Sequence, residues 1–195
     1  MEKYSFLIQQ RFAPIVNRYD FYEYRNDQKG APVAFGQQKR FNFREEINVW
    51  KNDSKTEVLF KIKAEKILDI HGKFLVTDGT GNLIGYFTKQ FRSSLVRSTW
   101  EVFDAKDNLL FSAVEKNKSV AIIRRIGNIF GDLELLRFLP INFIFEKNGE
   151  IVGGHTRIWS SLKDTYKIFA DEKIGEVDAR MFLALGMLLD AVQDR

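Results

Sequence analysis

Residues 181–189, close to the C-terminus, form an unbroken run of apolar residues and glycine, preceded by Asp178 and followed by Asp190. Asp178 is of a residue type that caps helix N-termini, and Asp190 closes the apolar run. A helix that is apolar on every side must be buried on every side. About twelve helical residues span roughly 18 Å, short of the roughly 20 residues that cross a bilayer. We therefore predict a helix at about residues 180–192 that the rest of the chain surrounds.

The composition is that of an ordinary globular domain, with 45% hydrophobic and 29% charged residues and three prolines among 195 residues. This favours a single domain, residues 1–195. The chain has no cysteine, which excludes disulfides and thiolate metal sites and favours a reducing, cytoplasmic setting. The N-terminal residues lack the features of a signal peptide. The net charge of +4 and the pI near 9.2 are compatible with contacts to anionic lipid or nucleic acid.

Turn signals rich in Asp, Asn and Gly recur along the chain, most of them about 26 residues apart. They are residues 26–30, 51–54, 78–82, 104–108, 146–149 and 170–173. An aromatic or branched stretch precedes each turn, and a second one follows most of them. Six turns with two strands each predict about twelve strands.

Strict alternation marks one of these stretches: Phe60 and Ile62 alternate with Lys61 and Lys63, as in a strand with one buried face. Closing such a sheet removes its exposed edges, and a barrel of about twelve strands is too wide for its own side chains to fill. We therefore predict a mainly β fold: a closed antiparallel β-barrel of about twelve strands that encloses the C-terminal helix. A helix pressed between a two-sheet sandwich and a partner subunit is the alternative.

The turn at residues 78–82 between paired strands, the strand sequence of residues 100–104 and the C-terminal apolar helix together resemble the Tubby C-terminal-like superfamily. Within it, the chain resembles the LURP-one-related proteins and the phospholipid scramblases, over roughly residues 4–192. The resemblance implies a twelve-stranded barrel around a central hydrophobic helix. It also implies phosphoinositide or membrane binding, although many LURP-one-like proteins have no assigned activity.

Two scramblase properties are not expected here. The chain has no cysteine for palmitoylation, and residues 78–82 lack the downstream glutamate and the ligand spacing of an EF-hand loop. We expect a hairpin turn at residues 78–82, with no calcium site.

Residues that could carry catalysis are sparse. His71 and His155, the two histidines, are far apart and lack the spacing of a metal-binding motif, and no serine lies in a G-x-S-x-G elbow. Gly79, Gly81 and Gly85 superficially match a dinucleotide-binding loop, but the sequence after them continues as a strand where that loop needs a helix. We expect no metal, no cofactor and no enzymatic activity.

The one long interval between turns contains an amphipathic segment at residues 120–130. Ile122 and Ile126 fall on its apolar side, and Arg124 and Arg125 on the opposite side. Lys116 and Lys118 precede it. In one interpretation the segment is a helix packed over an open end of the barrel with its arginines in water. In the other it binds an anionic membrane surface through its basic and apolar side chains.

Two further basic clusters could extend such a surface. They are Lys39, Arg40 and Arg44, and Lys89, Arg92 and Arg97. Nucleic acid would be bound by the same residue types, but the interleaved Phe41 and Phe43 fit a buried strand face better than a stacking platform. The sequence predicts a cytoplasmic, non-enzymatic protein that binds anionic phospholipid or phosphoinositide at the membrane periphery. A protein-interaction scaffold with an unidentified partner is the alternative, and the oligomeric state stays open.

Overall fold

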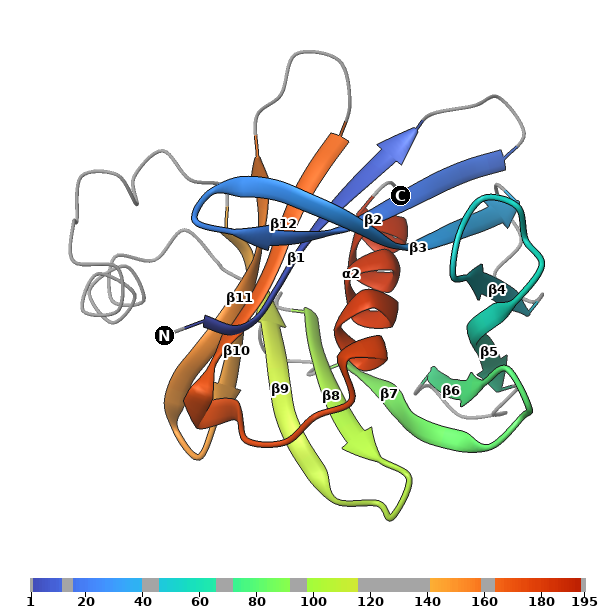
Figure 1. Ribbon diagram of the computed structural model, residues 1–195. Helices are drawn as coiled ribbons and strands as arrows, with labels where there is room; N and C mark the ends of the chain where they lie inside the picture. The colour runs from blue at the N-terminus through green and yellow to red at the C-terminus, as the bar shows by residue number, and fades with distance from the viewer. Residues whose placement is uncertain are drawn as a thin grey trace.

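The computed structural model describes residues 2–11, 16–39, 46–65, 72–91, 98–115, 141–158 and 164–193. These residues form a closed antiparallel barrel, a short 3-10 helix and a C-terminal α-helix (Figure 1). The strands are β1 (Glu2–Arg11), β2 (Val16–Arg25), β3 (Gln28–Lys39), β4 (Ile47–Trp50), β5 (Val58–Glu65), β6 (Lys73–Asp78), β7 (Leu83–Phe91), β8 (Ser98–Asp104), β9 (Leu109–Glu115), β10 (Ile141–Lys147), β11 (Glu150–Ile158) and β12 (Asp164–Asp171). The helices are η2 (Glu172–Ile174) and α2 (Ala179–Gln193).

Each strand pairs with its neighbours in sequence, and β1 closes the ring by pairing with β12. In that last ladder Phe6 lies opposite Ile168, and Ile8 lies opposite Tyr166. Closure satisfies the backbone groups that an open sheet would leave at its two edges. The predicted barrel of about twelve strands is thereby confirmed, and the two-sheet sandwich is wrong.

The residues of the hairpin turns explain where the strands reverse. Asn26 and Asp27 join β2 to β3 with φ angles of 49° and 55°, and Asn148 and Gly149 join β10 to β11 with φ angles of 52° and 79°. A two-residue hairpin of this kind needs positive φ at both positions, which Asn, Asp and Gly adopt at the lowest cost. Five of the six predicted turns are hairpins for reasons of this kind.

The sixth predicted turn, residues 170–173, is not a hairpin. β12 ends at Asp171, whose carboxylate accepts a hydrogen bond from the backbone N–H of Lys173 at 2.8 Å and so caps the helix η2. Gly175, with φ of 78°, then turns the chain toward α2. The sixth turn signal therefore accounts for only one strand, β12. The remaining strand of the twelve is β1, which none of the six turn signals indicated.

Hydrogen bonds from β1 and β10 hold the end of η2 and the segment that follows it against the barrel. Lys3 Nζ donates to the carbonyl of Gly175 at 3.0 Å, and Lys147 Nζ donates to that of Ile174 at 2.6 Å. The backbone N–H of Val177 donates to the hydroxyl of Tyr4 at 3.2 Å. These bonds fix the point at which the chain enters the barrel.

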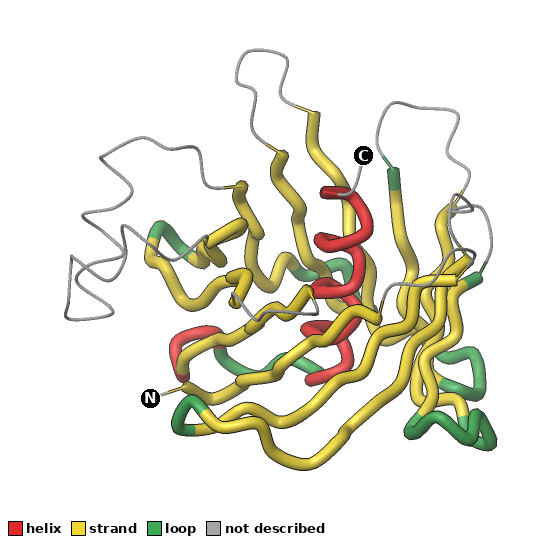
Figure 2. Tube along the Cα trace, turned by 90° about the horizontal axis from the view of Figure 1, so that it is seen from above, coloured by secondary structure: helices red, strands yellow, loops and turns green. Residues whose placement is uncertain are grey.

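Helix α2 fills the interior of the barrel, and Figure 2 shows it from above with strands around it. Asp178 caps its start, because its carboxylate accepts a hydrogen bond from the backbone N–H of Arg180 at 2.9 Å. Phe182 stacks on Phe111 at a centroid distance of 5.7 Å and lies 4.7 Å from the ring of Tyr4. The predicted helix at about residues 180–192 is confirmed, and it extends one residue further at each end.

Asp190 ends the apolar run but not the helix, in agreement with the predicted helix at about residues 180–192. It lies within α2 and is fully buried. A carboxyl group inside the barrel requires polar neighbours, and the interior supplies them, as described below.

Successive strands run in opposite directions, which defines two ends of the barrel. The five hairpin turns and the start of α2 lie at one end, which we call the turn end. The opposite end, which we call the connection end, holds the last residues of the odd-numbered strands: Arg11, Lys39, Glu65, Phe91, Glu115 and Ile158. Helix α2 runs from the turn end to the connection end.

Candidate functional site

Most of the basic residues singled out in the sequence lie outside the described residues. These are Lys116, Lys118, Arg124, Arg125, Arg40, Arg44, Arg92 and Arg97, together with Ile122 and Ile126 of the amphipathic segment. Lys39 and Lys89 lie within described strands, Lys39 at the end of β3 and Lys89 near the end of β7.

The strands nevertheless relate the three basic clusters to one another. The first cluster begins at the end of β3, the second at the end of β7, and the third directly after β9. All three strands are odd-numbered, so all three end at the connection end. The chain outside the described residues holds 12 of the 30 Lys and Arg side chains and 5 of the 26 Asp and Glu side chains. The basic excess of the protein therefore belongs to segments that follow strands ending at the connection end.

Lys89 shows how one of these side chains is placed. It lies directly opposite Trp100 of β8, and its ammonium group is 5.6 Å from the centroid of that ring. Trp100 is fully buried, so Lys89 lies against the core of the barrel through this ring.

A buried polar group faces the C-terminal half of α2. His155 on β11 is fully buried and stacks on Tyr166 of β12 at a centroid distance of 5.1 Å and an interplanar angle of 15°. Burial lowers the pKa of His155 to about 3, so its ring is neutral at physiological pH. Burial and the carboxylate of Asp190 both raise the pKa of Tyr166. Sequence analysis identified His155 only as a strand residue and missed its partnership with Tyr166.

The described residues form a pocket of about 350 Å³ at the turn end, where α2 begins. Three segments that are distant in sequence line it: the β6–β7 hairpin, the β8–β9 hairpin, and the linker before α2 together with the first turn of α2. The lining residues are Asp78, Leu83, Ile84, Asp104, Leu110, Glu176, Val177, Asp178, Arg180 and Met181. Half of them are apolar and half are charged.

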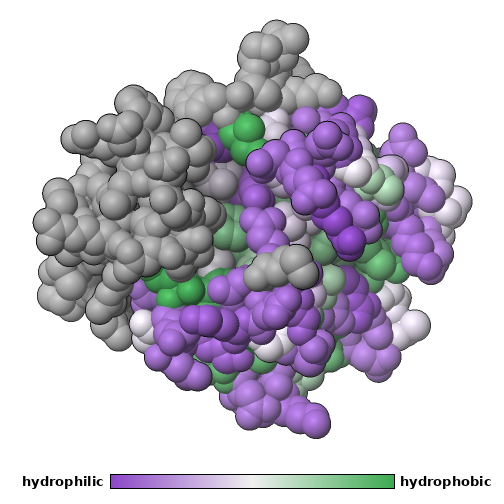
Figure 3. Space-filling model, turned by 60° about the vertical axis from the view of Figure 1, so that its left-hand side comes forward, coloured by the Kyte–Doolittle hydropathy of each residue, from purple (hydrophilic) through white to green (hydrophobic). Residues whose placement is uncertain are grey.

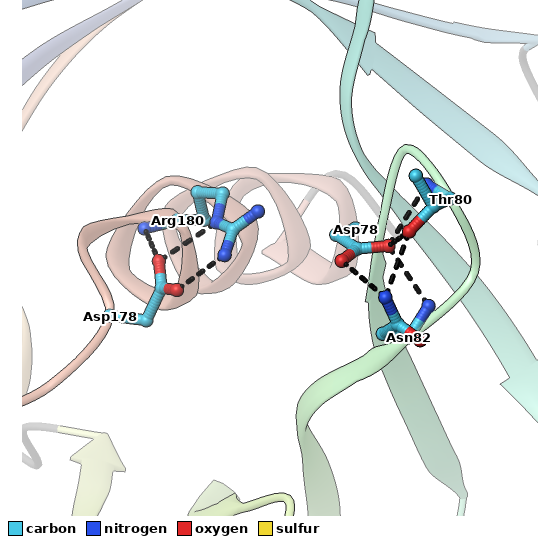
Figure 4. Close-up of polar contacts among 5 residues, drawn as sticks. All are labelled: Asp78, Thr80, Asn82, Asp178 and Arg180. Atoms are coloured by element: carbon cyan, nitrogen blue, oxygen red, sulfur yellow. Dashed lines mark hydrogen bonds and ion pairs between the residues drawn. The ribbon is translucent and has the colours of Figure 1, made fainter.

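The Asp78 carboxylate is held rigidly at the rim of this pocket (Figure 4). It accepts hydrogen bonds from the backbone N–H groups of Thr80 and Asn82, both at 2.9 Å, and from the side-chain amide of Asn82 at 3.1 Å. Hydrogen bonds from Thr80 and Asn82 lower the pKa of Asp78, so the group is ionised at physiological pH.

The β8–β9 turn repeats this arrangement. Asp104 accepts from the backbone N–H groups of Lys106 and Asn108 at 2.8 and 2.9 Å, and from the side-chain amide of Asn108 at 2.9 Å. Hydrogen bonds from Asn108 lower its pKa as well. The shared spacing, Asp followed four residues later by Asn, was visible in the sequence and is the signal that could have paired the two turns.

Among the described residues, the one cation that lines the pocket is already engaged. Arg180 donates to Asp178 through Nε at 3.0 Å and through a terminal nitrogen at 2.6 Å, as Figure 4 shows. The guanidinium is therefore neutralised by its neighbour, and the remaining carboxylates give the pocket a negative potential.

Apolar side chains are exposed beside the pocket. The described surface drawn in Figure 3 is mostly hydrophilic. Among the described residues, the exposed large hydrophobic side chains are Leu83, with 40% of its surface accessible, and Leu109, with 52%. Leu83 lines the pocket, and Leu109 directly precedes Leu110, which also lines it.

The described residues also bear on two other kinds of site. No helix there is long and apolar enough to span a membrane. No cluster of three or more His, Asp or Glu side chains there has the arrangement to hold a metal ion.

Comparison with known proteins identifies the family of the chain. A search of curated protein sequences gave no significant match. The model of the LURP-one-related family matches residues 33–190, which run from within β3 to the buried Asp190 of α2. This match covers well over half of the chain and agrees with the twelve-stranded barrel around a central helix. The chain therefore belongs to the LURP-one-related family.

Proposed function

We propose that the protein binds anionic phospholipid, phosphoinositides included, at the membrane periphery through the basic segments that follow strands ending at the connection end. The observation that carries the proposal is the parity of β3, β7 and β9, after which the three basic clusters begin. The three strands that precede or contain the start of these clusters all end at the connection end, which supports a shared binding surface. Membership of the LURP-one-related family, which is generally not catalytic, supports a binding role.

The expected affinity is modest. Each basic side chain near an anionic surface contributes about 1 kcal/mol, so Lys116, Lys118, Arg124 and Arg125 together contribute a few kcal/mol. This electrostatic part is screened by salt. Insertion of Ile122 and Ile126 among the lipids would add an apolar part that salt does not weaken.

The charge at the opposite end supports one orientation. Asp78, Asp104 and Asp178 are ionised at the turn end, where an anionic membrane would repel them. The barrel would therefore present its connection end to the lipid and keep its turn end in water.

Co-sedimentation with liposomes tests the proposal. The native protein should pellet with vesicles that contain phosphatidylserine and a phosphoinositide at low salt, and less so at high salt. Arg124→Glu combined with Arg125→Glu should abolish most of this binding. The matched control, Lys51→Glu combined with Lys106→Glu, makes the same charge change on two exposed side chains of the turn end and should bind like the native protein. Equal binding by the two double variants, or none by the native protein, would refute this role.

The second candidate is a protein-interaction scaffold. The pocket at the turn end, with its exposed leucines, is the specific observation that favours it. The two roles use opposite ends of the barrel and can coexist.

A further inference from the structure

We propose that the pocket at the turn end docks a partner protein through a basic side chain, Lys or Arg, that stands between apolar residues in an exposed segment of that partner. The inference is independent of lipid binding, because it concerns the opposite end of the barrel.

The size of the pocket limits the occupant. Sites for drug-sized molecules and cofactors have volumes of roughly 300–1,000 Å³, and the pocket, at about 350 Å³, lies at the small end of that range. It has room for one or two long side chains. An occupant that extends further must lie across the surrounding surface.

The walls of the pocket favour an aliphatic stem. Ile84 of β7, Leu110 of β9 and Met181 of the first turn of α2 line it. Lysine and arginine bury their methylene stems against such side chains while the charged head stays near polar groups.

The charges of the rim select the head group. Asp78 and Asp104 are fixed by their own turns and stay ionised, and Glu176 is the most exposed of the lining carboxylates, with 94% of its side chain accessible. Lys3 contacts Glu176 from outside the pocket at 2.6 Å. Lys3 offsets the charge of Glu176, and Arg180 offsets that of Asp178. The fixed carboxylates of Asp78 and Asp104 therefore leave a net negative charge that attracts a cation and repels an anion.

The exposed leucines define what flanks the basic side chain. Leu83 and Leu109 follow the two carboxylate turns directly; Leu83 lines the pocket, and Leu109 holds the corresponding position of the neighbouring hairpin. An apolar residue on either side of the basic one would cover them and remove their surface from water. The surface therefore fits a short apolar–basic–apolar stretch.

The pentapeptide acetyl-Ser-Leu-Lys-Leu-Ser-amide is a suitable probe, followed by amide chemical-shift changes in the folded, isotope-labelled protein. We expect weak, saturable binding that high salt reduces, with shifts confined to residues 78–84, 104–110 and 176–181. The same peptide with Glu in place of Lys should cause none of these shifts.

Two substitutions at exposed side chains test the pocket without disturbing the fold. Glu176→Lys and Leu83→Ser should each weaken binding of the lysine peptide by about fivefold or more, the effect of losing one rim charge or one apolar contact. Glu150→Lys is the matched control: it makes the same charge change at another exposed glutamate of the turn end, outside the pocket, and should bind like the native protein.

Several results would overturn the inference. They are shifts that map away from the pocket, equal binding by Glu176→Lys and Glu150→Lys, equal binding of the lysine and glutamate peptides, and no binding at all. Shifts at these residues on dilution of the protein alone would identify a second copy of the chain as the occupant and would also overturn it.

Discussion

Gly186 of α2 faces Ile8 of β1 so closely that a Cβ atom on Gly186 would lie 2.2 Å from Cδ1 of Ile8. Both residues belong to the core, and Ile8 is fully buried. The helix therefore approaches the strand that closes the barrel through its one residue without a side chain. This contact ties the first strand, the last helix and barrel closure together.

Gly186→Ala should destabilise the protein although alanine is the better helix former. Alanine gains about 1 kcal/mol of helix propensity, whereas overpacking of a filled core costs about 1–3 kcal/mol. Ile8→Val removes Cδ1 and should make Gly186→Ala better tolerated than it is in the native background. Urea unfolding of the two single variants and the double variant measures this coupling. A Gly186→Ala variant that is more stable than the native protein would show that the Ile8 side chain can adopt a rotamer that makes room for the new methyl group.

Leu185→Asp should prevent stable folding. Leu185 is fully buried in the middle of α2, and a buried carboxylate without a partner costs several kcal/mol against a total stability of about 5–15 kcal/mol. Leu109→Asp makes the same change at a side chain that is 52% exposed and should leave the unfolding midpoint almost unchanged. A cooperatively folded Leu185→Asp protein would contradict the buried position of the helix.

The sequence predicted the architecture well because its signals are local. Residues such as Asn26 and Asp27 indicate the hairpin turns, and the continuous apolar run of α2 indicates that the helix is buried. The turn signals did not predict β1, because its partners include β12, more than 150 residues away in sequence. No turn connects these two strands at the point where the barrel closes. The turn at residues 170–173 was misassigned because an Asp cap of a 3-10 helix uses the same residues as a hairpin.

The candidate sites could be predicted only in part. Basic side chains were evident in the sequence, but relating β3, β7 and β9 to one end of the barrel depends on counting every strand between them. The pocket brings Asp78 together with Asp178, residues 100 positions apart, through contacts between hairpins and the helix start. Local periodicity contains no information about such contacts.

Asp78→Ala should lower the thermal unfolding midpoint more than Asp78→Asn does. Alanine leaves the backbone N–H groups of Thr80 and Asn82 without their acceptor, whereas asparagine retains an amide oxygen that can accept from them. Because hydrogen bonds lower the pKa of Asp78, its contribution is present above the ordinary aspartate pKa and is lost as the pH falls below it. Thermal unfolding at neutral pH ranks the variants, and equal midpoints for Ala and Asn would show that the turn does not depend on this acceptor.

The pH dependence of stability should report the burial of His155. Its pKa is lowered from 6.5 to about 3, so the folded protein holds the neutral ring while the unfolded chain binds a proton below pH 6.5. Stability is therefore fully present above pH 6.5 and falls as the pH drops toward 3. Between pH 6.5 and 4.5 the loss due to this ring should be about 2–3 kcal/mol, and the titration of Asp and Glu side chains adds its own change toward the lower end of that range.

The variant His155→Phe isolates this effect. Neither ring nitrogen of His155 is hydrogen-bonded to a described residue, so phenylalanine keeps the stacking on Tyr166 and sacrifices no bond within that part of the chain. We expect the variant to lose most of the decline in unfolding free energy between pH 6.5 and 4.5, measured by urea unfolding at several pH values. His71→Gln, at the other histidine, should keep the native pH dependence. A His155→Phe profile parallel to that of the native protein would mean that His155 is protonated in the folded barrel, which requires an anionic neighbour such as Asp190 to hold that charge.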